Sequence, residues 1–228
     1  MLSLARKARY RAKEAARQIE FRLGWSAFQR SLRSGRTPRL SVLEQLARGW
    51  GNQAWCASAG FLEAMLEWLP KTHASILECG SGLSTLLLAA GASTGAREVH
   101  SLEHDPDWAA YTTRRLPQRL RERVSVCNAP LRSYGDFDWY SIDPGVIPQP
   151  IGYVVCDGPP SITRGGRYGL GPVLRSYFQP GCVILLDDTQ RDGERAIVAR
   201  WQAELGATVI QEGETFTVLR VGSPNPAI

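Results

Sequence analysis

Several features that would assign this chain quickly are missing from its sequence. No run of about 18 apolar residues occurs, so we expect no transmembrane helix. The N-terminus has no apolar segment typical of a secretory signal. Scattered cysteines without a C-x-x-C pair argue against a zinc site and favour buried thiols in a reducing compartment, so we expect a cytoplasmic protein. The five cysteines are Cys56, Cys79, Cys127, Cys156 and Cys182.

Two common nucleotide-binding signatures are also missing. No Gly-Lys-Ser/Thr sequence occurs, which argues against a P-loop. A dinucleotide fingerprint needs G-x-G-x-x-G, and here Thr85 follows Gly80 and Gly82 where the third glycine should stand. This departure argues against an NAD-dependent oxidoreductase, which we keep as an alternative.

Acidic residues are scarce near the N-terminus. Residues 1–39 contain eleven Lys or Arg residues but only two acidic ones, Glu14 and Glu20. The whole chain has a net charge of only +5. The basic character therefore belongs to this segment and not to the rest of the chain.

Residues 3–33 have the periodicity of an amphipathic helix. Its apolar stripe consists of Ala5, Ala8, Ala12, Ala16, Ile19 and Leu23, and its basic face of Arg6, Arg9, Lys13 and Arg17. Such a helix can pack on its own domain or on a second subunit of a homo-oligomer. It can also hold the protein peripherally on an anionic membrane surface, act as an organelle-targeting peptide or bind nucleic acid. Packing is the simplest interpretation, the membrane surface ranks next and nucleic acid ranks last.

A turn or linker at residues 34–38 ends this helix. We therefore divide the chain into a basic amphipathic helical extension over 1–40, a domain over 41–222 and a tail over 223–228. Two further helices, at 41–48 and 53–69, precede the first strand.

From residue 75 strands alternate with helices, which predicts a parallel sheet with helices on both faces. Strands are expected at 75–79, 99–103, 124–127, 153–156 and 181–186, and helices at 84–91, 105–116, 170–178 and 192–204. A polar loop is expected at 132–150, and two last strands, at 207–211 and 215–221, form a hairpin. The fold class is therefore α/β: a Rossmann-like, doubly wound, mostly parallel seven-stranded sheet with an antiparallel C-terminal edge strand, plus a helical N-terminal extension.

Polar residues follow the apolar strands at the end where such sheets bind ligands. They are Glu78, Glu103, Asn128, Asp157 and Asp187. Glu78 would repel a pyrophosphate but suits a cation, and Glu103 can accept hydrogen bonds from ribose hydroxyls. S-adenosylmethionine meets both requirements, because it carries a sulfonium, an ammonium and a ribose but no phosphate.

These strand ends resemble the motifs of class I S-adenosylmethionine-dependent methyltransferases. The matching segments are 77–82, 103–105, 128–131, 157–160 and 180–188. The resemblance implies that the glycine turn faces the methionine part of S-adenosylmethionine, that the second segment holds the ribose and that the third lies near the adenine. The implied cofactor-binding residues are Glu78, Gly80, Ser81, Gly82, Ser84, Glu103, His104, Trp108, Asn128, Ala129 and Asp157.

Metal-dependent O-methyltransferases offer a finer resemblance. Asp157, Asp187 and Asp188 stand where those enzymes bind a metal, which would be Mg²⁺ with these oxygen ligands. The metal would help to deprotonate a substrate hydroxyl, and Asp157 is the candidate catalytic base. The alternative is that Asp187 and Asp188 cap the following helix or pair with Arg191 and Arg195.

The loop over 161–169 is the expected acceptor wall, where Arg164, Arg167 and Tyr168 could grip an anionic or sugar substrate. The sequence thus predicts methyl transfer to an oxygen of a small molecule or glycan. The alternatives are a nucleic-acid methyltransferase, the NAD-dependent oxidoreductase and a non-catalytic binding module.

Overall fold

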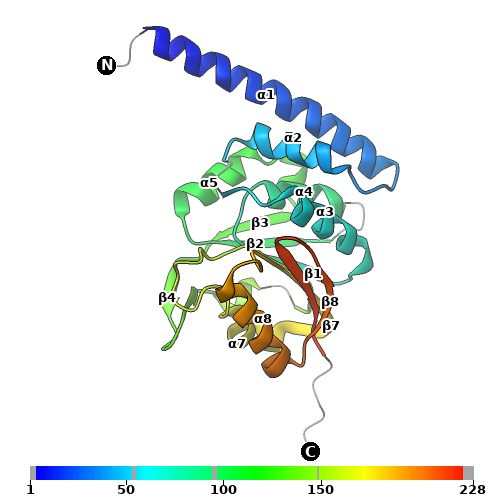
Figure 1. Cartoon of the computed structure of the whole chain (residues 1–228), viewed down its shortest axis with the longest axis vertical. Coiled ribbons are helices and arrows are strands. Elements are labelled where there is room, and N and C mark those ends of the chain that lie inside the picture. The colour runs from blue at the N-terminus through cyan, green and yellow to red at the C-terminus, as the bar shows by residue number, and fades with distance from the viewer. Residues whose placement is uncertain (1–3, 53–54, 94–96, 148, 223–228) are drawn as a thin grey trace, which may run out of the picture. The chain divides into compact units, whose positions relative to one another are not determined.

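A computed structural model of the chain describes residues 4–52, 55–93, 97–147 and 149–222 (Figure 1). It divides into two compact units, Met1–Glu63 and Ala64–Ile228. The predicted boundary at residue 40 falls inside the first unit, so the division of domains made from the sequence stays a prediction. The predicted tail over 223–228 lies outside the described residues.

The first unit is built on two helices, α1 (Leu4–Arg33) and α2 (Leu40–Trp50). An aromatic row on α1 packs beside α2: the rings of Phe21 and Trp50 are centred 6.0 Å apart, and those of Trp25 and Phe28 5.2 Å apart. Phe28 is fully buried. These side chains bury more apolar area than alanines do, which explains why this face of α1 meets α2.

The predicted apolar stripe of α1 remains at the surface. Ile19 is 57% exposed and Leu23 60% exposed. On the face that meets α2, a guanidinium nitrogen of Arg17 donates to the carbonyl oxygen of Gly51 at 3.5 Å. These two residues of the stripe do not pack within this unit, and the amphipathic extension stays a prediction.

Helix α3 (Ala59–Trp68) begins later than the sequence suggested. The hydroxyl of Ser58 accepts the backbone N–H of Phe61 at 3.1 Å, as an N-cap does. A 3₁₀ turn over Leu69–Lys71 then leads into the sheet.

The second unit is one seven-stranded sheet with the order β3-β2-β1-β6-β7-β9-β8. Its strands are β1 (Ser75–Cys79), β2 (Val99–Glu103), β3 (Val124–Asn128), β6 (Ile151–Cys156), β7 (Phe178–Asp187), β8 (Thr208–Glu212) and β9 (Phe216–Arg220). Its helices are α4 (Leu83–Ala92), α5 (Pro106–Arg115), α6 (Gln118–Arg121), α7 (Leu170–Leu174) and α8 (Asp192–Leu205). Strand β9 lies between β7 and the edge strand β8 and pairs antiparallel with both, whereas the other strand pairs in this sheet are parallel. The predicted doubly wound, mostly parallel sheet is confirmed.

Helices cover both faces of the sheet. Successive side chains of a strand point to opposite faces, so each strand contributes to both layers. Leu77 and Cys79 belong to the cluster that contains Leu170 of α7 and Trp201 of α8. Glu78 points to the other face, where it meets α4. The strands between these layers are apolar on both sides, as parallel strands must be.

The predicted loop over 132–150 was wrong in part. It holds a small antiparallel sheet of β4 (Leu131–Ser133) and β5 (Asp138–Tyr140), followed by a 3₁₀ turn over Pro144–Val146. Strands of three residues are too short to show alternation in the sequence. Trp139 and Tyr140 stabilise this sheet by burying their rings completely in the main core.

The described cysteines are free thiols, of which Cys79, Cys156 and Cys182 are buried in strands. None of the described helices combines the length and the apolar character needed to cross a membrane.

A close approach of two chain segments requires glycine at position 152. A Cβ there would overlap the carbonyl oxygen of His73. We expect Gly152→Ala to lower the free energy of unfolding by about 2–3 kcal/mol. Urea denaturation measures the change. The control is Gly193→Ala in α8, where a Cβ meets nothing within 4 Å and alanine favours the helix. Equal stability of the two variants would contradict the overlap.

Candidate active site

The site lies where the order of the strands reverses. Strand β1 pairs with β2 on one side and with β6 on the other, and ligands of such sheets bind at this point. Gly80 follows β1 with φ of 89°, and a Cβ on it would lie 3.2 Å from the nitrogen of Gly158. The backbone N–H of Asp157 donates to the carbonyl oxygen of Cys79 at 2.9 Å. Glycine at position 80 thus allows the ends of β1 and β6 to touch.

Glu78 is fully buried beneath this turn. Its Oε2 accepts a hydrogen bond of 2.6 Å from the hydroxyl of Thr85. The same hydroxyl accepts the N–H of Gly82 at 2.9 Å. Thr85, which interrupts the dinucleotide fingerprint, therefore joins the acid to the glycine turn. Sequence analysis missed this role. Thr85 stands three residues after Gly82, the N-cap of α4, and a side chain at that position can reach back to the N–H of the N-cap.

The other oxygen of Glu78, Oε1, has no hydrogen-bond partner in the described part of the chain. Burial raises the pKa of Glu78 to about 7, although the nearby hydroxyls of Ser101, Ser84 and Thr85 lower it. An unpartnered buried oxygen is costly. A ligand ammonium would satisfy it, so the residues fit the amino group of S-adenosylmethionine.

Glu103 holds the turn from the second strand. Its Oε2 accepts the N–H and the hydroxyl of Ser81, both at 2.9 Å. Its Oε1 accepts the N–H of Asp105 at 3.0 Å and lies 2.9 Å from Nδ1 of His104. A ribose hydroxyl would replace one of these donors. The Ser81 hydroxyl can be released most easily, because Thr112 offers it another acceptor at 3.4 Å.

The residues predicted near the adenine lie beside this acid. Nε1 of Trp108 donates to the carbonyl oxygen of Ser81 at 2.7 Å, so the indole lies against the glycine turn. The N–H of Ala129 donates to the carbonyl oxygen of Glu103 at 2.6 Å, and Asn128 pairs with Glu103 across β2 and β3. The structure thus brings the predicted cofactor-binding residues to one edge of the sheet.

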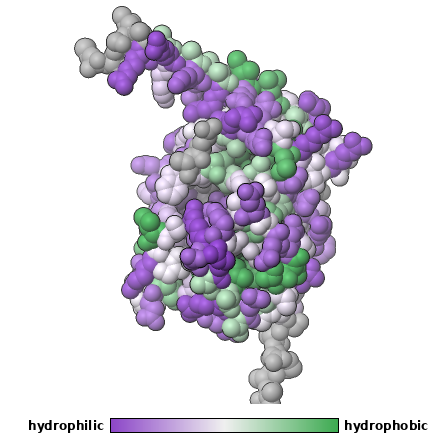
Figure 2. Space-filling model, in the orientation of Figure 1, coloured by the Kyte–Doolittle hydropathy of each residue, from purple (hydrophilic) through white to green (hydrophobic). Residues whose placement is uncertain are grey.

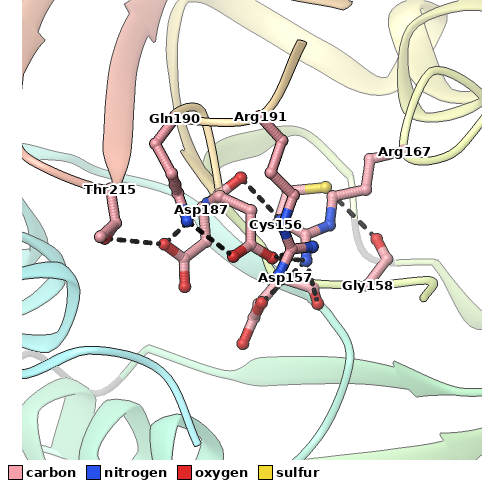
Figure 3. Close-up of polar contacts among 9 residues, drawn as sticks. Cys156, Asp157, Gly158, Arg167, Asp187, Gln190, Arg191 and Thr215 are labelled. Atoms are coloured by element: carbon pink, nitrogen blue, oxygen red, sulfur yellow. Dashed lines mark hydrogen bonds and ion pairs between the residues drawn. The ribbon is translucent and has the colours of Figure 1, made fainter. Parts of the chain in front are cut away.

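Asp157 and Asp188 meet at the ends of β6 and β7 around Arg167, which is 3% exposed. Figure 3 shows the contact of Arg167 with Asp157. One terminal nitrogen of Arg167 lies 3.0 Å from Oδ1 of Asp157 and 2.7 Å from Oδ2 of Asp188. The other donates to the carbonyl oxygen of Asp187 at 2.7 Å. Arg167, predicted to grip substrate, is here buried and bound to the protein's own oxygens.

Asp187 and Asp188 are held by local bonds as well. Oδ1 of Asp187 accepts the N–H of Asp188 at 2.8 Å and the hydroxyl of Thr215 at 3.2 Å. Asp188 has φ of 63° and lies 2.9 Å from a guanidinium nitrogen of Arg191. The pairing of Asp188 with Arg191 was the alternative to a metal site, whereas Arg195 pairs with Asp192.

This arrangement does not fit Mg²⁺. The described residues contain no group of three or more His, Cys, Asp or Glu side chains that could hold a metal ion. A guanidinium stands between Asp157 and Asp188 instead. We therefore derive no step through a metal, and the sequence-based metal ligands stay a prediction.

Asp157 has the properties of a base near neutral pH. Burial raises the pKa of Asp157 to about 8, against the charge of Arg167, which lowers it. Burial likewise raises the pKa of Asp187 to about 6. A base is most effective when its pKa lies near the working pH.

The other two predicted substrate residues contact the protein on either side of the loop. Arg164 lies 2.6 Å from Oδ1 of Asp138 in β5. The hydroxyl of Tyr168 donates to Glu204 of α8 at 2.8 Å, and the guanidinium of Arg200 lies 3.4 Å from the centre of its ring. Between them Ile162 is 93% exposed, so the loop is anchored at its ends and open at its tip.

Comparisons with known proteins bear on the family and the fold. Residues 77–189 match the model of a family described as a methyltransferase domain, and no curated protein matches the sequence. Residues 77–189 are therefore assigned to a methyltransferase domain.

Solved structures share the fold of this methyltransferase. An O-methyltransferase from Bacillus cereus in complex with SAH is 19% identical, with 81% of this chain and 90% of that chain covered and a TM-score of 0.51. A Staphylococcus aureus protein assigned as a caffeoyl-CoA O-methyltransferase is 11% identical, with 80% and 92% covered and a TM-score of 0.59. The SAH-bound methyltransferase PaMTH1 from Podospora anserina is 16% identical, with 81% and 88% covered and a TM-score of 0.52.

The buried acid makes cofactor binding depend on pH. In the folded, unliganded protein the pKa of Glu78 is raised from 4.5 to about 7. The protonated side chain therefore stabilises the folded state relative to the unfolded state. This contribution is complete below pH 4.5 and is lost as the pH rises through 7. Ligand ammonium needs the ionised form. We expect the Kd for S-adenosylmethionine to rise by up to about tenfold per pH unit below 7, as measured by calorimetry at pH 6, 7 and 8.

Glu78→Gln should bind more weakly and lose most of this pH dependence. The exposed Glu122→Gln is the matched control and should behave as the wild-type methyltransferase does. A wild-type Kd that is constant between pH 6 and pH 8 would refute this role of Glu78.

Proposed function

We propose that this methyltransferase transfers the methyl group of S-adenosylmethionine to an oxygen of a small molecule or glycan, with Asp157 as the general base. One observation carries the proposal: the turn that fits the cofactor touches the strand end that presents Asp157, at Gly80 and Gly158. Donor and acceptor would therefore meet at one edge of the sheet.

The cofactor half of the site has three parts. Oε1 of Glu78 receives the ammonium, Glu103 takes the ribose after release of the Ser81 hydroxyl, and the free N–H groups at the start of α4 face the carboxylate of the methionine part. When bound, S-adenosylmethionine supplies a methyl group on a positively charged sulfur. The protein then contributes mainly by placing the two reactants in line.

The acceptor half rests on Asp157. A hydroxyl is a weak nucleophile until its proton is removed. Burial raises the pKa of Asp157, which makes its carboxylate a stronger base than an exposed aspartate. The ion pair with Arg167 holds one oxygen of Asp157. The side chain keeps 23% of its surface exposed, which leaves room for a substrate to reach the other oxygen.

The O-methyltransferases among the solved structures support an oxygen acceptor. A nucleic-acid acceptor remains the second candidate, because the basic residues of α1 are exposed. Mg²⁺ has no part in the proposal, since Arg167 stands among its expected ligands.

The test starts from cofactor binding and then asks for the acceptor. Calorimetry should show heat with S-adenosylmethionine and none with NAD. Release of S-adenosylhomocysteine in a screen of phenols, catechols, sugars and RNA then identifies the acceptor class. We expect Asp157→Asn to lower kcat by about 10²-fold or more and to leave the Kd for S-adenosylmethionine nearly unchanged.

Asp192→Asn is the control, because this side chain is 95% exposed and outside the site. Absence of heat with S-adenosylmethionine would refute the cofactor assignment. Full activity of the Asp157→Asn variant would refute the base, and turnover only on RNA would favour the second candidate.

We infer that α1 lets the methyltransferase bind an anionic membrane surface. Figure 2 shows hydrophilic side chains along much of this helix, with apolar ones among them. Ile19 and Leu23 are exposed, and the basic residues from Arg6 to Lys13 are exposed as well. An exposed apolar stripe with flanking positive charge suits the boundary between anionic headgroups and acyl chains.

Sedimentation with vesicles tests this inference. The wild type should bind phosphatidylglycerol vesicles and bind phosphatidylcholine vesicles less, and high salt should weaken the binding. The affinity of the double variant Ile19→Ser and Leu23→Ser for phosphatidylglycerol vesicles should be lower by about tenfold or more. Ile162→Ser, which removes an exposed apolar side chain elsewhere, is the control. Dimerisation through the stripe without vesicle binding would overturn the inference.

A further inference from the structure

The acidic cluster of this methyltransferase already contains a cation. Strands β6 and β7 run side by side, with Cys156 opposite Leu186, so the acids that follow them gather at one place. Around Arg167 lie the carboxylates of Asp157 and Asp188 and the backbone carbonyl oxygen of Asp187 (Figure 3). A divalent ion bound to this cluster would need the same oxygens.

The guanidinium binds both strand ends at once. One nitrogen of Arg167 reaches the carbonyl oxygen and the carboxylate of Asp157, each at 3.0 Å, and the carboxylate of Asp188 at 2.7 Å. The other reaches the carbonyl oxygen of Asp187 at 2.7 Å. The planar fork of arginine can make such contacts together, whereas the single ammonium of lysine cannot reach as many.

The loop that carries Arg167 is folded back and held. Two turns close the loop. The N–H of Gly166 donates to the carbonyl oxygen of Thr163 at 2.8 Å, and the N–H of Tyr168 donates to the carbonyl oxygen of Gly165 at 3.1 Å. The N–H of Asp138 donates to the carbonyl oxygen of Arg164 at 2.9 Å. The backbone on both sides of Arg167 is therefore fixed, and the side chain enters the cluster from a set position.

Charge explains why the guanidinium stays. Arginine keeps its proton at any pH a protein experiences, and removing one partner from a buried ion pair leaves an uncompensated charge. Arg191 adds a second positive charge at Asp188 but is 47% exposed. With Arg167 in place, a divalent cation would meet a buried positive charge of its own sign. Without Arg167, the carboxylates of Asp157 and Asp188 would face only one arginine at the surface.

We propose that Arg167 is a positioning residue that replaces a divalent metal ion: it orients Asp157 for the acceptor and keeps metals out of the cluster of Asp157, Asp187 and Asp188. The positioning part rests on the proposed function, whereas the exclusion of metals does not. The two parts can therefore be tested separately.

Metal binding is the first readout. The protein is treated with EDTA, dialysed and titrated with Mn²⁺ by calorimetry. The wild type should show no Mn²⁺ site and no Mn²⁺-dependent change in Tm. Arg167→Ala should bind one Mn²⁺ ion and gain Tm with it, because the carboxylates of Asp157 and Asp188 and the carbonyl oxygen of Asp187 then lack their buried cation. Arg191→Ala is the matched control and should bind none.

The source of the new site is checked with a second substitution. Arg167→Ala combined with Asp188→Asn should bind Mn²⁺ at least about tenfold more weakly than Arg167→Ala alone, since a ligand is lost. A Mn²⁺ site in the wild type that disappears in Asp188→Asn would overturn the proposal. So would a folded Arg167→Ala protein that binds S-adenosylmethionine but no Mn²⁺.

Activity is the second readout and applies even if Arg167→Ala does not fold. Wild-type turnover, once an acceptor is found, should be unchanged by EDTA or added Mn²⁺. Arg167→Lys keeps the charge but loses the fork, so kcat should fall by about tenfold or more while the Kd for S-adenosylmethionine stays constant. Full activity of Arg167→Lys, or loss of wild-type activity in EDTA, would overturn the positioning role. Failure to find any acceptor refutes the proposed function and leaves the metal titrations to decide the exclusion.

Discussion

The contact between the ends of β1 and β6 is the constraint on which the rest of the site depends. The N–H of Asp157 reaches the carbonyl oxygen of Cys79 at 2.9 Å, and Gly80 lies against Gly158. A side chain at position 158 would overlap the hydroxyl of Tyr140. The two glycines thus allow β1 and β6 to end side by side. This contact brings Glu78, which lies under the glycine turn, close to Asp157.

The two halves of the site differ in how their buried charges are compensated. Oε1 of Glu78 has no partner among the described residues, and our proposal completes this half with a cationic ligand. Asp157 and Asp188 share the guanidinium of Arg167, so this half is complete before any ligand binds. A positively charged donor is therefore attracted to the first half, while the second keeps its geometry fixed.

Local patterns predicted the sheet well and the surroundings of the site less well. Strands 75–79 and 99–103 were placed at their observed bounds, because short apolar runs between turn residues are strong signals. The β4–β5 sheet was missed, since burial of Trp139 and Tyr140 decides it and burial depends on distant partners. Thr85 was treated as a missing glycine, although its hydroxyl joins Glu78 to the turn.

The sequence by itself determined the alternation of strands and helices, the acids at the strand ends and the preference for a cationic, phosphate-free cofactor. These follow from periodicity and residue chemistry within short segments. Only the tertiary structure decided that α1 packs through aromatic residues, leaving the predicted stripe exposed, and that Arg167 enters the acidic cluster instead of facing the acceptor. Burial and ion pairing between segments far apart in the chain decide such outcomes, because the energy of a charge depends on which oxygens surround it after folding.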